Sequence, residues 1–535
     1  MTKGLIVFSL LLFQLVAMAQ EDAWVYLIDK ENIAQALANP ASILSEKAID
    51  RKNRHGIAID ERDVPVNENY ISQIKAAPGI AVLAKSKWMN ALHVRGSQSD
   101  IENLQDNFSF VESIEFADRN KNASKGEEVK QKRKTETVLT AFNYGKALNQ
   151  IEMINGDQLH LSDYTGTGVT IAVLDGGFPN VNTMAALQRL RDAGNLKGAY
   201  DFVNRDDDVY TNTAGNHGTL VLSTMAAYLE GQYVGTAPDA SYYLFTTEDG
   251  TSENPVEESY WVEAAERADS LGVDVINSSL GYGKTYDNPN YAYSPSDFNG
   301  NTTFVSRGAN IAFEKGLLIV NSAGNSGNNG VGAPADSPGV LSIGAVDANG
   351  NYASFSSVGN SFQPSQKPDV VAQGQNSVVI NENDAIGPAN GTSFSSPILA
   401  GGIACLWQAL PNKTNVELMQ LIRESASQFE NPDNFLGYGI PNLEVALSSA
   451  LEITGLSNET PIKMFPNPAT NELFFSFNKN ATFYVDVFDV YGKHVLAFIL
   501  TDSKFKVNIA SLTNGVYFVN LQSSNESRTF KLIKR

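Results

Sequence analysis

The pattern of hydrophobic and polar positions between residues 138 and 452 alternates between short apolar runs and longer amphipathic stretches. Short continuous apolar runs are typical of strands buried on both faces, whereas apolar residues three or four positions apart are typical of helices. Strands are predicted at Val169–Leu174, Ser241–Thr246, Val273–Asn277, Leu317–Asn321 and Val340–Val346, and helices at Val262–Leu271 and Ile311–Lys315. This alternation predicts an α/β fold, in which a parallel sheet carries helices on both faces.

Polar side chains come directly after several of these predicted strands. Asp175, Asn277–Gly281 and Ser322–Asn325 each follow an apolar run. Open parallel sheets bind ligands at the carboxyl ends of their strands. We therefore expect the functional site of this region to lie at that edge of the sheet.

The region before the sheet, residues 20–118, has a mixed pattern that predicts a small α+β domain. Strands are predicted at Trp24–Ile28, Ile80–Leu83, Ala91–Val94 and Val111–Phe116, and helices at Ser72–Ala77 and Asp100–Asn107.

The last region, residues 462–535, contains short β-rich runs separated by turn signals such as Asn514-Gly515. Strands are predicted at Leu473–Phe477, Phe483–Val490, Phe505–Ile509, Val516–Leu521 and Arg528–Ile533. Several short strands in sequence predict a β-sandwich.

The N-terminus has the pattern of a secretory signal peptide over residues 1–19. A positive start at Lys3 precedes the apolar stretch Leu5–Val16 and the small-residue cleavage pattern Ala17-Met18-Ala19. Two polar linkers, residues 119–137 and 453–461, separate the other predicted domains. Lys132-Arg133-Lys134 in the first linker is either a protease target or simply part of a solvated segment, and the sequence favours neither.

The bulk composition excludes some classes of function. The formal net charge is −20 at pH 7, which argues against a nucleic-acid partner, since such proteins need a basic face. The single cysteine, Cys405, rules out an intramolecular disulfide, and its apolar surroundings predict a small buried side chain. No further apolar run reaches the roughly 20 residues that a transmembrane helix needs, so we expect no transmembrane segment.

Ser393 is the candidate nucleophile. It lies in Gly391-Thr392-Ser393, before the apolar helical pattern Ile398–Leu410, and Pro397 suits the first turn of that helix. A serine at the start of a helix places its hydroxyl and backbone N–H at the positive end of the helix dipole. Taken alone, such a serine is more often a plain helix cap.

His217 and Asp175 are the candidate base and orienting carboxylate. His217 precedes a predicted helix at Leu220–Leu229, and an imidazole is the natural general base at neutral pH. Asp175 ends a buried strand, where a carboxylate needs a partner. Alone, a capping histidine and an aspartate in a turn are the more common interpretations. Together with Ser393 they supply the three groups that activate a serine hydroxyl.

Two further groups complete the hypothesis. The Asn325 side-chain amide and the Ser393 N–H can form an oxyanion hole. The backbone of Ser279, Leu280 and Gly281 can pair with an extended peptide.

These motifs, in the order Asp, His, Ser, resemble those of the subtilases, the subtilisin-like serine peptidases. The resemblance covers residues 138–452 and implies catalytic roles for Asp175, His217 and Ser393 and an oxyanion role for Asn325. It also implies that the S1 cleft is formed by Ser279, Leu280, Gly281, Ser322, Ala323 and Gly324. The chain departs from the family pattern at Gly176, where Ser or Thr is usual, and at Phe394-Ser395, where Met-Ala is usual.

The flanking regions resemble parts of exported subtilases. Residues 20–118 resemble a propeptide that acts as an intramolecular inhibitor, with an independent adhesive domain as the alternative. The terminal region, with Asn514-Gly515-Val516-Tyr517 and the basic end Lys531–Arg535, resembles a type IX secretion sorting domain, with a carbohydrate-binding sandwich as the alternative. The resemblance implies polypeptide substrates, the type IX machinery as a partner, and a location outside or on the surface of a Gram-negative bacterium.

Two alternatives remain open at this stage. The chain could be a catalytically silent subtilase-fold protein that binds partners at a surface. No cofactor is needed for the chemistry and no metal ligand is predicted. Asp206-Asp207-Asp208 could hold a structural calcium ion, but an acidic run is more often simply solvated, and we favour the second interpretation.

Overall fold

The computed structural model describes residues 20–121, 142–211, 213–454, 463–476, 482–489, 493–500, 504–522 and 527–535. The predicted signal peptide and most of the two predicted linkers lie outside these residues. The chain divides into two compact units, residues 1–451 and residues 452–535.

A parallel sheet forms the centre of the first unit, as the sequence predicts, and it has seven strands, two more than the sequence pattern indicated. The strand order is β13-β12-β11-β10-β5-β9-β6. The strands are β5 (Thr170–Asp175), β6 (Leu196–Asp201), β9 (Ser241–Thr246), β10 (Val275–Ser278), β11 (Leu318–Ser322), β12 (Val340–Val346) and β13 (Val370–Gln373). The sequence pattern did not indicate β6, in which only Asp201 is fully buried, or the four-residue strand β13.

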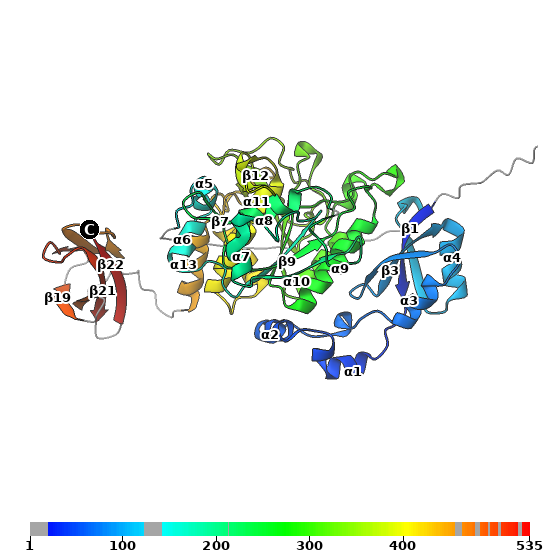
Figure 1. Cartoon of the computed structure of the whole chain (residues 1–535), viewed down its shortest axis with the longest axis horizontal. Helices are drawn as coiled ribbons and strands as arrows, with labels where there is room; N and C mark the ends of the chain where they lie inside the picture. The colour runs from blue at the N-terminus through cyan, green and yellow to red at the C-terminus, as the bar shows by residue number, and fades with distance from the viewer. Residues whose placement is uncertain are drawn as a thin grey trace, which may run out of the picture. The chain divides into compact units, whose positions relative to one another are not determined.

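Helices cover both faces of this sheet (Figure 1). Side chains of β5 alternate between the faces. Ile171 and Val173 pack in the core formed with α8 (His217–Ala226) and α11 (Thr392–Ala409). Ala172 and Leu174 pack in a second core with α9 (Val256–Leu271) and α10 (Phe304–Glu314). Because both faces are covered, every position of β5 is buried.

Smaller elements surround the sheet. These are α5 (Leu148–Glu152), α6 (Gly156–Leu161), α7 (Gln188–Asp192), β7 (Tyr228–Leu229), β8 (Tyr233–Val234), β14 (Ser377–Ile380), β15 (Ile386–Ala389), α12 (Asn415–Glu424) and α13 (Leu443–Thr454). Cys405 is buried in α11, as predicted, and its thiol donates to the Thr236 carbonyl at 3.2 Å.

The helix predicted at 220–229 is displaced in the structure. It begins at His217 and ends at Ala226, and Tyr228 and Leu229 instead pair with β8. The chain is already extended at Ala227, whose φ and ψ are −70° and 145°. The apolar pattern continued past the real end of the helix because the short strand is also partly buried.

The N-terminal part of the first unit is the predicted α+β structure. Its antiparallel sheet has the order β2-β3-β1-β4. The elements are β1 (Gln20–Leu27), α1 (Ile33–Ala38), α2 (Glu46–His55), α3 (Glu68–Lys75), β2 (Ala81–Ser86), β3 (Ala91–Ser97), α4 (Gln98–Asn107) and β4 (Val111–Phe116). The sequence pattern did not indicate α1 and α2, and α2 contains only two apolar residues, Ala48 and Ile49.

This sheet packs against helices α9 and α10. The Trp24 ring stacks on the Phe304 ring with centroids 4.8 Å apart, and its Nε1–H donates to Ser259 Oγ at 2.8 Å. Glu266 of α9 accepts hydrogen bonds from the Ser86 hydroxyl at 2.6 Å and from the backbone N–H of Trp88 at 2.9 Å. Apolar packing and hydrogen bonds therefore join the two parts into one unit.

Helix α2 contacts α9 through buried ion pairs. Lys52 lies 3.3 Å from Asp63 and 3.0 Å from Asp269, and Lys315 lies 2.7 Å from Asp63. Arg51 also bonds to Asp269. All five side chains are at most 1% exposed. The polar sequence of α2 is explained by these partners, which no local pattern reveals.

We expect Asp63→Asn to lower the free energy of unfolding by about 3 kcal/mol, since two buried ammonium groups lose a counter-charge. Burial by itself would raise the pKa of Asp63, but the charge of Lys52 and the hydrogen bond from Lys315 hold it below its ordinary value. The contribution of the ionised Asp63 to the free energy of unfolding is therefore complete at neutral pH and is lost as the pH falls below about 4. Urea denaturation monitored at pH 7 and pH 3 measures both effects.

The matched control is Glu68→Gln, which breaks an exposed pair with Lys85 at 2.7 Å. Such a pair is worth less than about 1 kcal/mol. Equal losses in the two variants would show that burial of the Asp63 pairs has no energetic consequence.

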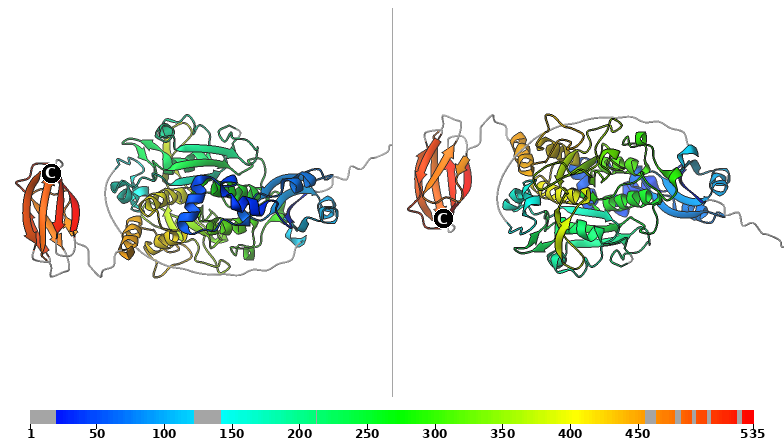
Figure 2. Two further views of the ribbon diagram at one scale, coloured as in Figure 1. Left: turned by 90° about the horizontal axis from the view of Figure 1, so that it is seen from below. Right: turned by 90° about the horizontal axis from the view of Figure 1, so that it is seen from above.

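The second unit is a β-sandwich of two antiparallel sheets, as predicted (Figure 2). The strands are β16 (Lys463–Phe465), β17 (Glu472–Ser476), β18 (Phe483–Asp489), β19 (His494–Leu500), β20 (Lys504–Asn508), β21 (Gly515–Gln522) and β22 (Ser527–Lys534). The sheet orders are β16-β17-β20 and β19-β18-β21-β22. Leu473 and Phe475 of one sheet share a core with Val485 and Val519 of the other. The sequence pattern did not indicate β16 and β19.

Candidate active site

Asp175 and His217 meet at the carboxyl end of the central sheet. Asp175 is the last residue of β5, and His217 is the first residue of α8. His217 Nδ1 lies 2.8 Å from Asp175 Oδ1, which also accepts the Gly176 N–H at 2.9 Å. The Asp175 side chain is 1% exposed. The carboxylate therefore holds the Nδ1 edge of the imidazole ring, and Nε2 lies on the opposite edge.

Gly218 allows this close approach of α8 to β5. A Cβ atom at position 218 would lie 2.4 Å from the Gly177 carbonyl oxygen and 3.0 Å from the Asp175 Cβ. Backbone cannot yield to such a contact, so a side chain here would push the helix away from the strand. A glycine is therefore needed at position 218 so that His217 can come within hydrogen-bond distance of Asp175.

The charge of Asp175 raises the pKa of His217 above its ordinary value, and this effect outweighs the burial that would lower it. Glu248 adds to the same effect. Burial raises the pKa of Glu248 itself to about 7. The site therefore favours the imidazolium form, which is the form that a general base must reach during catalysis.

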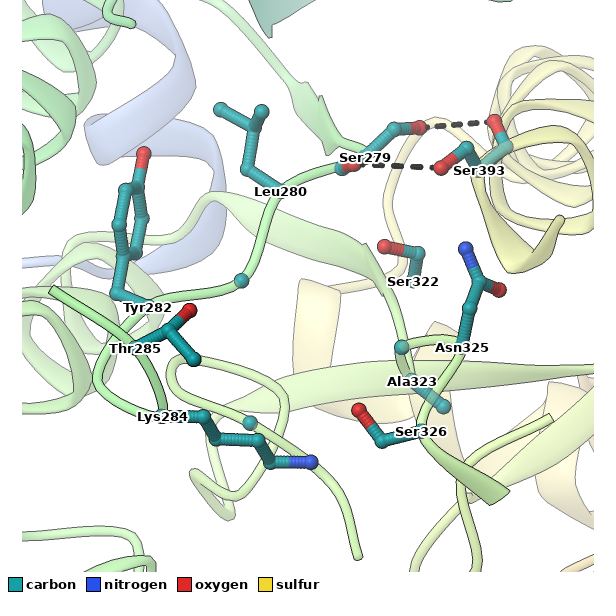
Figure 3. A pocket seen from close by; sticks show the side chains of 13 residues that line it. Ser279, Leu280, Tyr282, Lys284, Thr285, Ser322, Ala323, Asn325, Ser326 and Ser393 are labelled. Carbon is teal, nitrogen blue, oxygen red and sulfur yellow. Dashed lines mark hydrogen bonds between the residues drawn. The ribbon is translucent and has the colours of Figure 1, made fainter. Parts of the chain in front are cut away.

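Ser393 lies in the first turn of α11 and is 8% exposed. Its hydroxyl donates to the Ser279 carbonyl at a long distance of 3.4 Å (Figure 3). Within the described chain no hydrogen bond joins it to His217. The next residue, Phe394, places its ring centroid 5.9 Å from that of His217, so the serine and histidine belong to one site.

The predicted place of Pro397 in the first helical turn is wrong. Helix α11 begins at Thr392, so Pro397 is its sixth residue. A proline there has no N–H to donate to the carbonyl four residues earlier, that of Ser393. Ser279 Oγ donates to this carbonyl instead, at 2.9 Å. The proline thus leaves a backbone carbonyl free, and this carbonyl connects Ser393, the candidate nucleophile, to the segment after β10.

The Asn325 amide is held in one orientation. Its Oδ1 accepts the Thr392 N–H at 2.9 Å and the Thr392 hydroxyl at 3.0 Å. A backbone N–H needs an oxygen acceptor, so Nδ2 must lie on the other side, and Figure 3 shows it pointing toward Ser393. Gly391, with φ of 148°, adopts a backbone conformation that favours glycine. The Ser393 N–H lies in the first turn of α11, where an α-helix offers no acceptor.

A cavity of about 250 Å³ lies beside Ser393. All of the residues predicted for the S1 cleft line it: Ser279, Leu280, Gly281, Ser322, Ala323 and Gly324. Asn325 and Ser393 also line it. The structure thus brings the residues predicted to bind substrate and the two predicted oxyanion donors to one cavity.

Sequence reasoning missed other lining residues, namely Tyr282, Lys284, Thr285, Ser326 and Gly332. No sequence motif marks these individual positions. The sequence also contains no signal that Thr392 is the hydrogen-bond partner of Asn325, because the two residues meet only in the tertiary structure.

The segment after β10 has one position open for pairing. The Leu280 carbonyl already accepts from Asn321 Nδ2 at 3.0 Å, and the Tyr282 N–H donates to the Ala333 carbonyl at 2.8 Å. Gly281 between them is exposed. Its backbone N–H and carbonyl have no hydrogen bond to any residue that the structure describes.

The acidic run at 206–208 uses its carboxylates locally. Asp206 Oδ1 accepts the Asp208 N–H at 2.9 Å, and Asp208 Oδ1 accepts the Tyr210 N–H at 2.9 Å. In the described parts of the chain, no three His, Cys, Asp or Glu side chains gather as a metal site. None of the described helices is both long enough and apolar enough to span a bilayer.

Sequence comparison identifies the family. The sequence model of the Subtilase family matches residues 166–439, which include every site residue described above. The chain belongs to the subtilase family. It is therefore a member of the subtilisin-like serine peptidases. Its subtilase region is preceded by a match to the Peptidase S8 propeptide domain of Bacteroidota at residues 22–136, and is followed by a secretion system C-terminal sorting domain at residues 463–535.

Individual subtilases match over most of their own length. Subtilisin NAT from Bacillus subtilis subsp. natto is 30% identical over 301 residues, which cover 55% of this chain and 70% of that protein. M-protease from Shouchella clausii (strain KSM-K16) is 27% identical over 412 residues, covering 76% of this chain and 94% of that protein. A solved structure of proteases from Pseudoalteromonas arctica PAMC 21717 aligns with 23% identity and a TM-score of 0.46, over 58% of this chain and all of that chain.

Proposed function

We propose that this subtilase is a secreted serine endopeptidase that cleaves peptide bonds through Asp175, His217 and Ser393. The observation that carries the proposal is the 2.8 Å contact between His217 Nδ1 and the buried Asp175, with Ser393 in the adjoining helix turn. This contact holds the imidazole in the tautomer that leaves Nε2 free to accept a proton.

In the proposed reaction, the Ser393 hydroxyl turns from the Ser279 carbonyl to His217 Nε2. His217 takes the proton while Ser393 Oγ forms a bond to the peptide carbonyl carbon, and Asp175 stabilises the imidazolium. The oxyanion accepts hydrogen bonds from Asn325 Nδ2 and the Ser393 N–H. His217 then protonates the leaving amine, and water hydrolyses the acyl-enzyme by the same route. The substrate backbone pairs with Gly281 as an added strand.

The test is covalent labelling of the purified secreted protein with a fluorophosphonate probe, followed by peptide mapping of the adduct. We expect a single adduct on Ser393, and hydrolysis of casein that phenylmethylsulfonyl fluoride abolishes. A folded protein that neither labels nor hydrolyses casein would contradict the proposal and would favour a silent binding role.

Asn325→Ala is expected to lower kcat by ~10²–10³, the range known for an oxyanion-hole asparagine in subtilisin. The physical reason is that Nδ2 acts on charge that develops only in the transition state. Steady-state kinetics on a peptide p-nitroanilide separate kcat from KM. A loss confined to KM would place Asn325 in ground-state binding instead.

We further propose that the propeptide domain acts as an intramolecular inhibitor and that the sorting domain directs the protein, through the type IX machinery, to the outside or the surface of a Gram-negative bacterium. The packing of the N-terminal sheet on α9 and α10 supports the first role, because it keeps this domain bound to the subtilase region. N-terminal sequencing and intact mass of the secreted species would show where the mature chain begins and ends.

A further inference from the structure

The cavity beside Ser393 is polar on most sides. Its lining includes the side chains of Ser279, Ser322, Ser326 and Asn325, together with backbone of the glycine-rich segments (Figure 3). No carboxylate is among the residues that line it. The hydroxyl and amide groups of this lining offer hydrogen-bond partners to a polar side chain.

Lys284 supplies a positive charge to this cavity. It is half-buried among the lining residues, and its Nζ donates to the Gly330 carbonyl. Burial lowers the pKa of Lys284 to about 8, and no charged neighbour contributes to this shift. The ammonium therefore remains mostly protonated at pH 7.

Two fully buried lysines, Lys367 and Lys315, differ from Lys284 in having an acidic partner. Lys367 lies 2.9 Å from Asp369, and Lys315 lies 2.7 Å from Asp63. Among the described residues no carboxylate lies within ion-pair distance of Lys284. A partly desolvated cation without a counter-ion is costly, so a carboxylate that entered the cavity would supply the missing partner.

Gly332 leaves room beside the lysine. A Cβ atom at position 332 would lie 3.9 Å from Lys284 Cε and 3.6 Å from the Tyr282 carbonyl oxygen. A larger side chain there would extend into the space next to the lysine stem. The Tyr282 hydroxyl donates to Glu248 at 2.6 Å, so it does not compete for Lys284.

We propose that Lys284 is a specificity-determining residue and that the cavity selects substrates with an acidic side chain, glutamate or aspartate, at the P1 position. This inference rests on the proposed peptidase function, because the cavity adjoins the nucleophile and the oxyanion donors. A carboxylate in the cavity forms an ion pair with Lys284 and accepts hydrogen bonds from the serine hydroxyls.

The test compares peptide p-nitroanilides that differ only at P1, with Glu, its neutral isostere Gln, Phe, or Lys. For the wild-type protein at pH 7 we expect kcat/KM for Glu to exceed that for Gln by about 10- to 100-fold, the effect of one partly buried ion pair. Lys284→Met keeps the aliphatic stem and should reduce this ratio to about 1. Lys284→Glu should favour Lys over Gln.

The matched control is Lys197→Met. Lys197 is exposed on β6 and donates to the Gly194 carbonyl at 2.8 Å, but it does not line the cavity. We expect this variant to keep the wild-type ratio, which excludes an effect of net charge alone. Fluorophosphonate labelling of each variant checks that the nucleophile is intact.

The outcomes separate the two proposals. A wild-type protein that labels normally but cleaves after Phe or Gln as well as after Glu would overturn the role of Lys284 and leave the peptidase function standing. A wild-type protein that neither labels nor cleaves any of the substrates would overturn both. If Lys284→Met does not fold, the wild-type ratio of Glu to Gln decides the question by itself.

Discussion

Ser393→Ala is expected to lower kcat for peptide hydrolysis by ~10⁶-fold, the scale known from removal of the subtilisin nucleophile. The alanine has no hydroxyl to attack the carbonyl carbon, so no acyl-enzyme forms. Activity that remains reflects the oxyanion donors and substrate binding alone. The fold should persist, because the hydroxyl makes a single 3.4 Å hydrogen bond to the Ser279 carbonyl. Casein hydrolysis and fluorophosphonate labelling measure the loss.

Ser395→Ala is the matched control. Ser395 lies in the same helix, is fully buried, and donates to the Thr392 carbonyl at 3.0 Å. Alanine is also the usual residue of the family at this position, so we expect kcat within a few-fold of wild type. Equal labelling of Ser393→Ala and wild type would show that another residue is the nucleophile.

Asp175→Asn is expected to lower kcat by ~10⁴-fold, as removal of the orienting carboxylate does in serine peptidases. The amide oxygen can still accept the Gly176 N–H and the His217 Nδ1–H, so the fold should persist. What is lost is the negative charge that stabilises the imidazolium when Ser393 gives up its proton. Stopped assays at high enzyme concentration measure the residual rate.

The same variant should move the pH profile. Asp175 raises the pKa of His217, and the base is active only when neutral. In the wild type, kcat/KM should therefore rise with pH through a value above the ordinary 6.5 of histidine. In Asp175→Asn this rise should shift to lower pH. Asp347→Asn, in an exposed turn, is the control, and an unshifted profile in Asp175→Asn would show that Asp175 does not act on His217.

The sequence predicted most of the central sheet and the position of the candidate site for a clear physical reason. Strands such as Val340–Val346 are buried on both faces, so their apolar character shows in a short window. The polar residues that follow strands lie at one edge because parallel strands share a direction. The hydrophobic pattern did not predict β6, because that strand is incompletely buried. It did not predict α2, because charged residues of that helix are buried.

The sequence by itself determined the fold class and which residue types stand at the carboxyl ends of the strands. Only the tertiary structure decided their distances and partners. Pro397 lies inside α11, so the Ser393 carbonyl is free to accept the hydrogen bond from Ser279. Thr392 orients the Asn325 amide by donating to its Oδ1. The tertiary structure also brought Lys284 into the cavity beside Ser393. Hydrophobic periodicity is a property of neighbouring residues, whereas these contacts join residues separated by scores of positions and depend on how whole elements pack.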